Sequence, residues 1–589
     1  MLQISSGKFY ENNEIDQLYI TTHRGVLFTN HGFLLDRIAT PVGDLLPAAR
    51  WGDLQTIVCE VTERLPKFGG QMRAGDIVSV GPDTLIQDFS ALVSFRLNVT
   101  CTPDRDLAQR LIVAQRPPLG ISALPREYVS RMFDASIPYR GEDIDDLRSF
   151  ITDLMGLSRK SYSGVMRAIR RYVTSMHRLA DDLDLSYALL VASIESLAQE
   201  FDEFAPAWGD YPQQKRKPVD DALVGVTEDV CARVRQAILK SEHVASKRRF
   251  YEFSDHYLQP KFFREEAKDQ LYPVGRTELG IALKNAYDLR SKYIHALKPL
   301  PKNLVLRPSH NDTQIVESRY LLTFHGLARV ARHIILEFVK QSPKVAQERF
   351  DYTSDYPNML RMQWAPQYWI GNPDAYTLDT SRMVLNGFLS QVASQIFDPT
   401  QKVTDLRLVV KKIETIVPSL AKLEQKMPML ALHFLFNAYL PSDEQVPGQT
   451  FLQPYLEHFD NPSIDSLLAH FLGGAQKPVW SLENSDLLLA EYNKQRFHKN
   501  GLNAGPLIGA ALILWVAEMH RASGNHERAH ELIAHAAEEY PQQKGIYEFE
   551  KRHPDGDISE IRCWHVLLPR LQSLEVNQPA EHVVPGDSS

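Results

Sequence analysis

The sequence predicts an α+β multidomain protein: a β-rich N-terminal domain of sandwich or barrel type, then an all-helical bundle and a helical C-terminal region. Three observations support this prediction. At 589 residues the chain is long enough for several domains. Its content of 44% hydrophobic and 23% charged residues is ordinary for a globular protein and excludes disorder as the main state. The spacing of apolar residues changes from strand-like to helical near residue 105.

The predicted domain division follows this change of spacing. Runs rich in Val, Ile, Thr and aromatic residues predict a β-rich domain over residues 1–120; they include QTIVCEVTERL, GDIVSVG and ALVSFRLNVTC. The sequence does not identify the role of this domain, and a sensor is one candidate. Helical spacing predicts a bundle over 140–345 and a second helical region over 350–575, followed by a flexible tail over 576–589. Helices of the bundle are expected at 142–156, 159–182, 184–204, 219–242, 276–298 and 314–341.

Several classes of protein are excluded or disfavoured by composition and motifs. A net charge of −8 disfavours coating of nucleic acid through general basicity. The four cysteines form no C-x-x-C pair and predict a reducing, cytoplasmic location, and the longest apolar runs are too short for a membrane span. No phosphate-binding glycine motif is present, so we expect no cofactor. No metal site is expected either, because the C-terminal histidines lack a Cys or Asp set; they are His520, His526, His530 and His535.

The segment TELGIALKNAYDLRSKYIHALKPLP is the most informative of the chain. Its apolar stripe places Arg290 at the centre of a face that packs against the core, and His295 lies about 140° away around the helix. A buried guanidinium needs an acceptor, so we infer an ion pair with Glu195, which interrupts the apolar segment LSYALLVASIESLAQEF. The alternative is that Arg290 reaches the surface or serves packing alone. The stripe consists of Leu279, Leu283, Ala286, Tyr293 and Leu297.

These two segments resemble the HEPN superfamily of small helical domains, and most closely its ApeA-like branch. The resemblance covers about residues 140–345 and rests on VASIESLAQ followed by AYDLRSKYIHA, with the spacing Arg, four residues, His. The spacing alone is not specific, since it or a close variant recurs elsewhere, for example from Arg170 to His177. Its context, near the end of a well-formed helix and after a Glu-bearing helix, carries the resemblance.

The resemblance implies metal-independent RNA cleavage by attack of the ribose 2′-hydroxyl on the adjacent phosphate. His295 would act as general base or acid, and Arg290 would stabilise the phosphorane. Glu195 and Ser291 would orient or support them, and the site would form between two copies of the domain. Position 291 is Ser where many active members have Asn, Asp or His, and Leu297 replaces the tyrosine of antitoxin-controlled members.

Basic residues interleaved with aromatic residues follow upstream of this helix. Such interleaving predicts a surface that holds an RNA backbone and stacks bases, although an amphipathic connector with a solvated basic face has the same pattern. The basic residues proposed for RNA binding are Lys247, Arg248, Arg249, Lys261 and Arg264, and the aromatic ones are Phe250, Tyr251, Phe262 and Phe263.

The C-terminal region contains a segment, 506–541, that resembles one tetratricopeptide unit. Gly524, Ala529, Ala536 and Pro541 stand at the spacings of that motif. The resemblance implies a protein-binding surface, and a plain helical hairpin is the alternative. The resemblance to HEPN domains implies an RNA-cleaving homodimer, and by analogy with other HEPN proteins a role in antiviral (phage) defence by abortive infection; no membrane partner is expected. The alternative is a catalytically inert HEPN scaffold that dimerises and presents its helical C-terminus to partners.

Overall fold

The computed structural model divides the chain into two compact units, Met1–Met362 and Gln363–Ser589, and we describe each by itself. The tail expected at 576–589 lies outside the described residues. These are residues 2–6, 8, 18–33, 36–66, 76–78, 82–118, 121–201, 207–211, 213–241, 246–346, 348, 359–361, 364–440, 444–445, 450–475, 477–554 and 556–568.

A small antiparallel sheet forms the N-terminal part of the first unit. Its strand order is β2-β3-β4-β1-β6, so that β2 and β6 are its edges. The two longest strands pair along their full length, from Leu18 opposite Pro66 to Thr29 opposite Gln55. The predicted sandwich or barrel is not found among the described residues, because the sheet stays open and helices cover it. The strands are β1 (Leu18–Thr29), β2 (Ile38–Thr40), β3 (Gly43–Pro47), β4 (Gln55–Pro66) and β6 (Cys101–Thr102).

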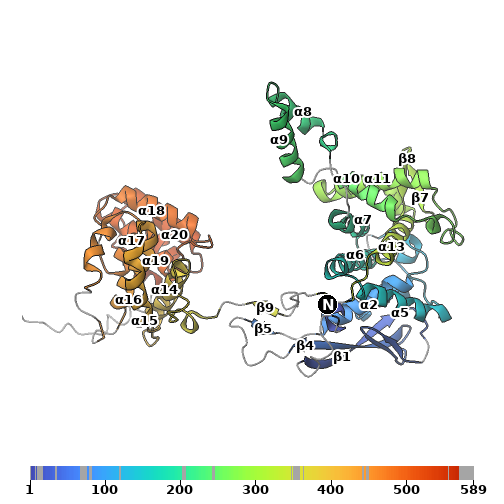
Figure 1. Ribbon diagram of the computed structural model, residues 1–589, viewed down its shortest axis with the longest axis horizontal. Coiled ribbons are helices and arrows are strands. Elements are labelled where there is room, and N and C mark those ends of the chain that lie inside the picture. Colours follow the sequence, from blue (N-terminus) through green and yellow to red (C-terminus); the bar gives the residue numbers. More distant parts are fainter. Residues whose placement is uncertain are drawn as a thin grey trace, which may run out of the picture. The chain divides into compact units, whose positions relative to one another are not determined.

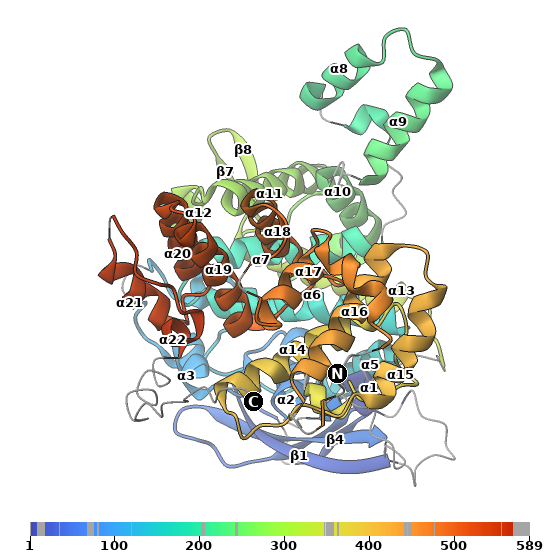
Figure 2. The same cartoon turned by 90° about the vertical axis from the view of Figure 1, so that its left-hand side faces the viewer.

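The helix α2 (Asp83–Leu97) lies against this sheet (Figure 2). It occupies part of a segment that was predicted to be a strand. The run ALVSFRLNVTC forms the end of α2 and then β6, where a single strand was predicted. Eleven of the 15 residues of α2 are buried, so its apolar residues show no clear helical period. Gly25 of β1 permits the close approach, since a Cβ there would lie 2.7 Å from the Ile86 side chain.

Within the run GDIVSVG, the described residues 76–78 form a short strand. β5 (Asp76–Val78) pairs with β9 (Met359–Arg361), which lies far along the chain. One continuous core extends from Leu2 through the sheet to Val339 of the last helix of this unit. The segments that were predicted as two domains, 1–120 and 140–345, therefore share one compact unit.

In the first unit, α7 packs on α6, α10, α11 and α13 (Figure 1). Most of the predicted helices are present with shifted ends. The long helices are α5 (Gly141–Met155), α6 (Arg159–Arg178), α7 (Leu183–Phe201), α10 (Ser246–Tyr257), α11 (Arg276–Ala296) and α13 (Phe324–Gln341). The shorter elements are α1 (Leu2–Ser5), α3 (Arg105–Ala108), a π-helical turn (Gln109–Val113), α4 (Pro125–Tyr128), 3-10 turns (Trp208–Asp210 and Pro260–Phe263) and α12 (Lys302–Leu306).

Two helix predictions need correction. The segment 219–242 is divided into α8 (Gln213–Ala222) and α9 (Glu228–Ser241), with Gly225 at a φ of 86° between them. The segment 314–341 begins as a hairpin of β7 (Thr313–Val316) and β8 (Arg319–Leu322) before α13 starts. Glu317 and Ser318 turn this hairpin with φ of 50° and 61°. A two-residue turn with both φ positive usually contains Gly or Asn, so Glu-Ser gave no turn signal.

The second unit is helical, as predicted. Its helix hairpin α19–α20 turns at Gly524, whose φ is 84°, and Ala517, Ala529 and Ala536 are fully buried between the helices. None of the helices in the described part of the chain has the length and apolar character needed to cross a membrane. The helices are α14 (Ser381–Phe397), α15 (Arg407–Ile416), α16 (Leu423–Ala438), α17 (Ile464–Leu472), α18 (Leu482–Gln495), α19 (Gly505–Ala522), α20 (His526–Glu539), α21 (Lys544–Arg552) and α22 (Cys563–Leu567). 3-10 turns occur at Pro366–Tyr368, Val417–Ser419 and Gln453–Asp460.

Candidate functional site

The structure contains the ion pair that the sequence predicts between α7 and α11. Arg290 Nη2 lies 2.6 Å from Glu195 Oε2, and the two side chains are 19% and 6% exposed. Glu195 is buried because the apolar face of α7 packs into the middle of the bundle. A charge in this position requires a partner, and the guanidinium of Arg290 supplies it.

Two further side chains complete the surroundings of Glu195. The Tyr287 hydroxyl donates a 3.0 Å hydrogen bond to Glu195 Oε1, and Gln199 Nε2 donates one of 3.2 Å to the same oxygen. Burial, with the neighbouring Glu195 carboxylate, raises the pKa of Tyr287 to about 12, so the hydroxyl keeps its proton and remains a donor. Arg290 Nε is buried and has no hydrogen-bond partner among the described residues. The carboxylate is therefore well satisfied, whereas the guanidinium keeps unused donors.

His295 lies in the last turn of α11, and its side chain is exposed. The predicted apolar stripe is buried at Leu279, Leu283 and Ala286 but leaves the bundle at this end, where Leu297 is 77% exposed. Within one chain, Arg290 faces α7 while His295 faces solvent, in agreement with the 140° expected from helical geometry. Ser291, next to Arg290, is half-buried.

The basic segment of α10 is tied to α11 near this site. Lys247 Nζ lies 2.7 Å from Asp288 Oδ2, so its charge is compensated by α11. Arg248 forms an exposed pair with Glu252 at 2.8 Å within α10, and Arg249 is half-buried. The three residues lie near the Arg290 end of α11.

Lys261 and Arg264 are exposed but lie toward the opposite end of α11. The chain reverses after α10, and Arg276, at the start of α11, donates to the Leu258 carbonyl and stacks on Phe263 at 4.8 Å. The 14 residues from Arg276 to Arg290 span about 20 Å of helix. The five basic residues therefore do not form one surface around the motif.

The aromatic residues of this segment are mostly part of the core. Phe250 is fully buried and Phe262 is 1% exposed, so neither is open to a stacking base. Tyr251 and Phe263 are half-buried and already face cations, with Lys284 Nζ 4.3 Å from the Tyr251 ring centre. The expectation of base stacking on this segment is wrong for the two buried rings, because Phe250 lies on the inner face of α10 and Phe262 packs inward from the 3-10 turn Pro260–Phe263.

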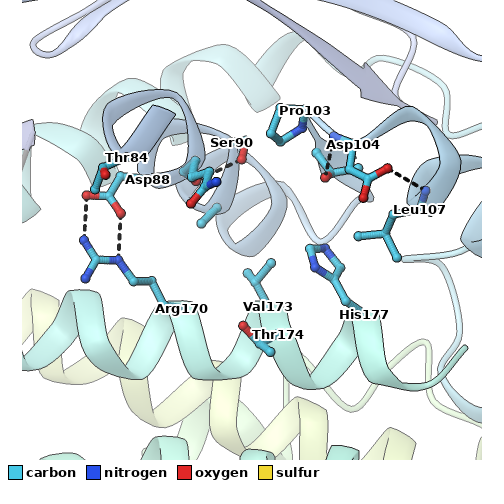
Figure 3. A pocket seen from close by; sticks show the side chains of 13 residues that line it. Thr84, Asp88, Ser90, Pro103, Asp104, Leu107, Arg170, Val173, Thr174 and His177 are labelled. Carbon is cyan, nitrogen blue, oxygen red and sulfur yellow. Dashed lines mark hydrogen bonds and ion pairs between the residues drawn. The ribbon is translucent and has the colours of Figure 1, made fainter. Parts of the chain in front are cut away.

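A pocket that sequence reasoning missed lies between α2 and α6 (Figure 3). It has a volume of about 480 Å³ and is lined by Asp88, Asp104, Arg170 and His177 among others. The pair Arg170–His177 is one of the recurring Arg–His spacings, which carried no information alone. The sequence did not place Asp88 near Arg170, because the region that contains Asp88 was predicted to be β and α2 was not recognised.

The four C-terminal histidines have separate neighbours. His520 Nε2 lies 3.2 Å from Asp486 Oδ2, and His535 Nε2 is 2.8 Å from Asn493 Nδ2. His530 and His526 approach the 556–557 turn. Across the described ranges no three His, Cys, Asp or Glu side chains are grouped as a metal site would require.

Comparison with known proteins gives no relative. No protein-family model matches the chain, and neither a curated protein nor a solved structure does. The expected relation to HEPN domains therefore stays a prediction from the residues of α7 and α11.

Proposed function

We propose that the chain is a metal-independent endoribonuclease of HEPN type. The observation that carries the proposal is the end of α11, where an exposed His295 follows an Arg290 that Glu195 holds at 2.6 Å. An exposed imidazole is accessible to a substrate, and a guanidinium with unused donors next to a buried carboxylate is held in a fixed orientation.

In this proposal the ribose 2′-oxygen attacks the adjacent phosphorus and the bond from phosphorus to the 5′-oxygen breaks. The imidazole of one His295 takes the proton of the 2′-hydroxyl, and an imidazole returns a proton to the leaving 5′-oxygen. The N–H donors of Arg290 stabilise the charge on the phosphorane oxygens. The products are a 2′,3′-cyclic phosphate and a 5′-hydroxyl.

The proposed site needs two copies of the chain, since Arg290 and His295 point in different directions within one copy. Exposed apolar side chains support an interface at this end of α11. Ile294 is 48% exposed and Leu297 77%, and they flank His295. Apolar groups on both sides of the imidazole favour a partner that covers them while leaving a polar cleft between the two copies.

The biological role proposed for this activity is phage defence, in which RNA degradation stops the growth of the infected cell. The N-terminal sheet and the helical second unit would sense a trigger or restrain the nuclease. The helix pair α19–α20 is the surface proposed for a protein partner. The competing function, an inert dimerising scaffold, uses the same apolar residues but not the imidazole.

The test is expression in cells of the wild type, of His295→Ala and of Lys292→Ala, a control at an exposed position of the same helix. We expect growth arrest and new RNA ends with 2′,3′-cyclic phosphates for the wild type and the control, before or after phage challenge. His295→Ala should abolish both effects. Equal behaviour of all three proteins, with or without phage, would favour the inert scaffold.

A further inference from the structure

The pocket between α2 and α6 has the features of a ligand site that is separate from the end of α11. Figure 3 shows the Arg170–Asp88 pair at one end of the pocket, His177 toward the other end, and Val173 and Thr174 between them. Its volume of about 480 Å³ lies in the range of pockets for small organic molecules, about 300–1,000 Å³.

The charges that line the pocket leave no free cation for an anionic ligand. Arg170 binds Asp88 through two hydrogen bonds of 2.7 Å, from Nε and Nη2, so the guanidinium is neutralised by a buried carboxylate. The second carboxylate, Asp104, accepts the Leu107 N–H at 3.0 Å and caps α3. Burial, with a contribution from Arg178, lowers the pKa of His177 to about 4, which makes its ring neutral at pH 7. Two carboxylates and one guanidinium disfavour a phosphate.

The imidazole of His177 lines the pocket, and one of its nitrogens has no partner among the described residues. Its Nε2 atom is buried and forms no hydrogen bond with any described residue. An unpaired buried polar atom is unfavourable, so a ligand group that bonds to it is bound favourably. The hydroxyl of Ser90 donates to the Gln87 carbonyl at 2.9 Å and therefore keeps its own lone pairs for a donor.

Apolar side chains also line the pocket, and Val173 is the one that Figure 3 shows between Arg170 and His177. Ala91, Val173 and Leu107 line the pocket. This pattern suits a flat ring whose faces are apolar and whose edge carries both donors and acceptors. A charged or wholly aliphatic molecule does not fit it.

We propose that this pocket binds an uncharged nucleobase or nucleoside, with its ring against Ala91, Val173 and Leu107 and its polar edge on His177. The remaining N–H groups of Arg170 would meet a carbonyl or hydroxyl oxygen of the ligand. The proposal does not depend on the RNase activity. It gives the first unit a site through which a small metabolite is recognised.

The test is calorimetric titration of the full chain with adenosine, guanosine, cytidine and uridine, with their free bases, and with the four 5′-monophosphates. We expect at least one base or nucleoside to bind, and its monophosphate to bind at least tenfold more weakly. Thr174→Trp fills the pocket from an exposed position of α6 and should abolish binding. Arg171→Trp, which is exposed on the same helix outside the pocket, should leave it unchanged.

His177→Leu tests the polar contact and should weaken binding at least tenfold while circular dichroism shows an intact fold. If this variant does not fold, Thr174→Trp decides alone. Absence of binding by every base and nucleoside at millimolar concentration would overturn the proposal. Equal binding by wild type and Thr174→Trp, or tighter binding of a monophosphate, would overturn it as well.

Discussion

Glu195 of α7 and Arg290 of α11 are 95 positions apart in the chain and meet through a 2.6 Å contact inside the helical bundle. The pair joins α7 to α11, and the C-terminal end of α11 carries the proposed RNase site. It also sets the direction of Arg290, because Tyr287 and Gln199 hold the other carboxylate oxygen. The energetic weight of this relationship can be measured.

Glu195→Gln should lower the free energy of unfolding by about 3 kcal/mol, because removing one partner of a buried pair leaves the other charge uncompensated. Urea denaturation followed by circular dichroism measures the loss. The control is Glu252→Gln, which breaks the exposed pair with Arg248 and should change stability by less than about 1 kcal/mol. Equal losses for the two variants would mean that the buried pair contributes no more to the free energy of unfolding than the exposed pair does.

Leu297→Gly should stabilise the protein by about 1 kcal/mol, since Leu297 ends α11 with a φ of 48°, a conformation that favours glycine. Its side chain is 77% exposed and contributes little packing within one chain. Thermal unfolding at several protein concentrations separates this effect from any loss of a dimer. Leu297→Ala removes the same side chain without relieving the backbone and should not stabilise; a gain of equal size there would contradict the explanation.

Gly326→Ala should be strongly destabilising, by about 3 kcal/mol or more. A Cβ at position 326 would lie 2.1 Å from the Asp312 carbonyl oxygen, and a backbone atom cannot move away as a side chain does. Gly275→Ala is the matched control, because no atom lies within 4 Å of its Cβ position. Soluble expression and unfolding midpoints compare the two. Near-wild-type stability of Gly326→Ala would show that the start of α13 is able to shift.

Acid should destabilise the first unit partly through His325. The pKa of this ring is lowered to about 4, chiefly by burial and in smaller part by Arg329 and His310, against an opposite effect of Asp312. In the unfolded chain His325 binds a proton with a pKa near 6.5, whereas in the folded chain it binds this proton only near pH 4. Stability is therefore complete above pH 6.5 and falls by up to about 3 kcal/mol as the pH decreases to 4.

The measurement is urea unfolding at pH 7 and pH 4.5 for wild type and His325→Gln. The variant cannot take up the proton and should lose less stability between the two pH values than the wild type does. Comparing the two proteins cancels the contributions of the other titrating groups, His177 among them. An equal loss in both proteins would show that the protonation of His325 does not contribute.

The sequence was a good guide where local pattern determines structure. The bounds of α5, α6, α7 and α11 were predicted to within a few residues, because each has a long apolar stripe and clear ends. The partner of Arg290 was predicted for a chemical reason, since a guanidinium cannot be buried alone. The roles of Arg290 and His295 in catalysis stay a prediction.

The sequence misled where a pattern has two meanings. The all-round burial of α2 removed its helical period, so its Val, Phe and Ser residues were interpreted as a strand. The Glu317–Ser318 turn lacks the residues that announce a hairpin, and β7 and β8 were assigned to a helix. The pattern of Phe250 and Phe262 suggested a stacking surface, although Phe250 on α10 and Phe262 in the following 3-10 turn are both buried in the core.

The sequence by itself determined the mostly helical character of the chain, the position of α11 and the need of Arg290 for a carboxylate. These follow from residue periodicity and from the cost of burying a charge, which act over short distances along the chain. Only the tertiary structure decided that the sheet and the bundle share one core, that Lys261 and Arg264 lie away from His295, and that α2 and α6 enclose a pocket. Those features arise from packing between distant segments, which no local pattern records.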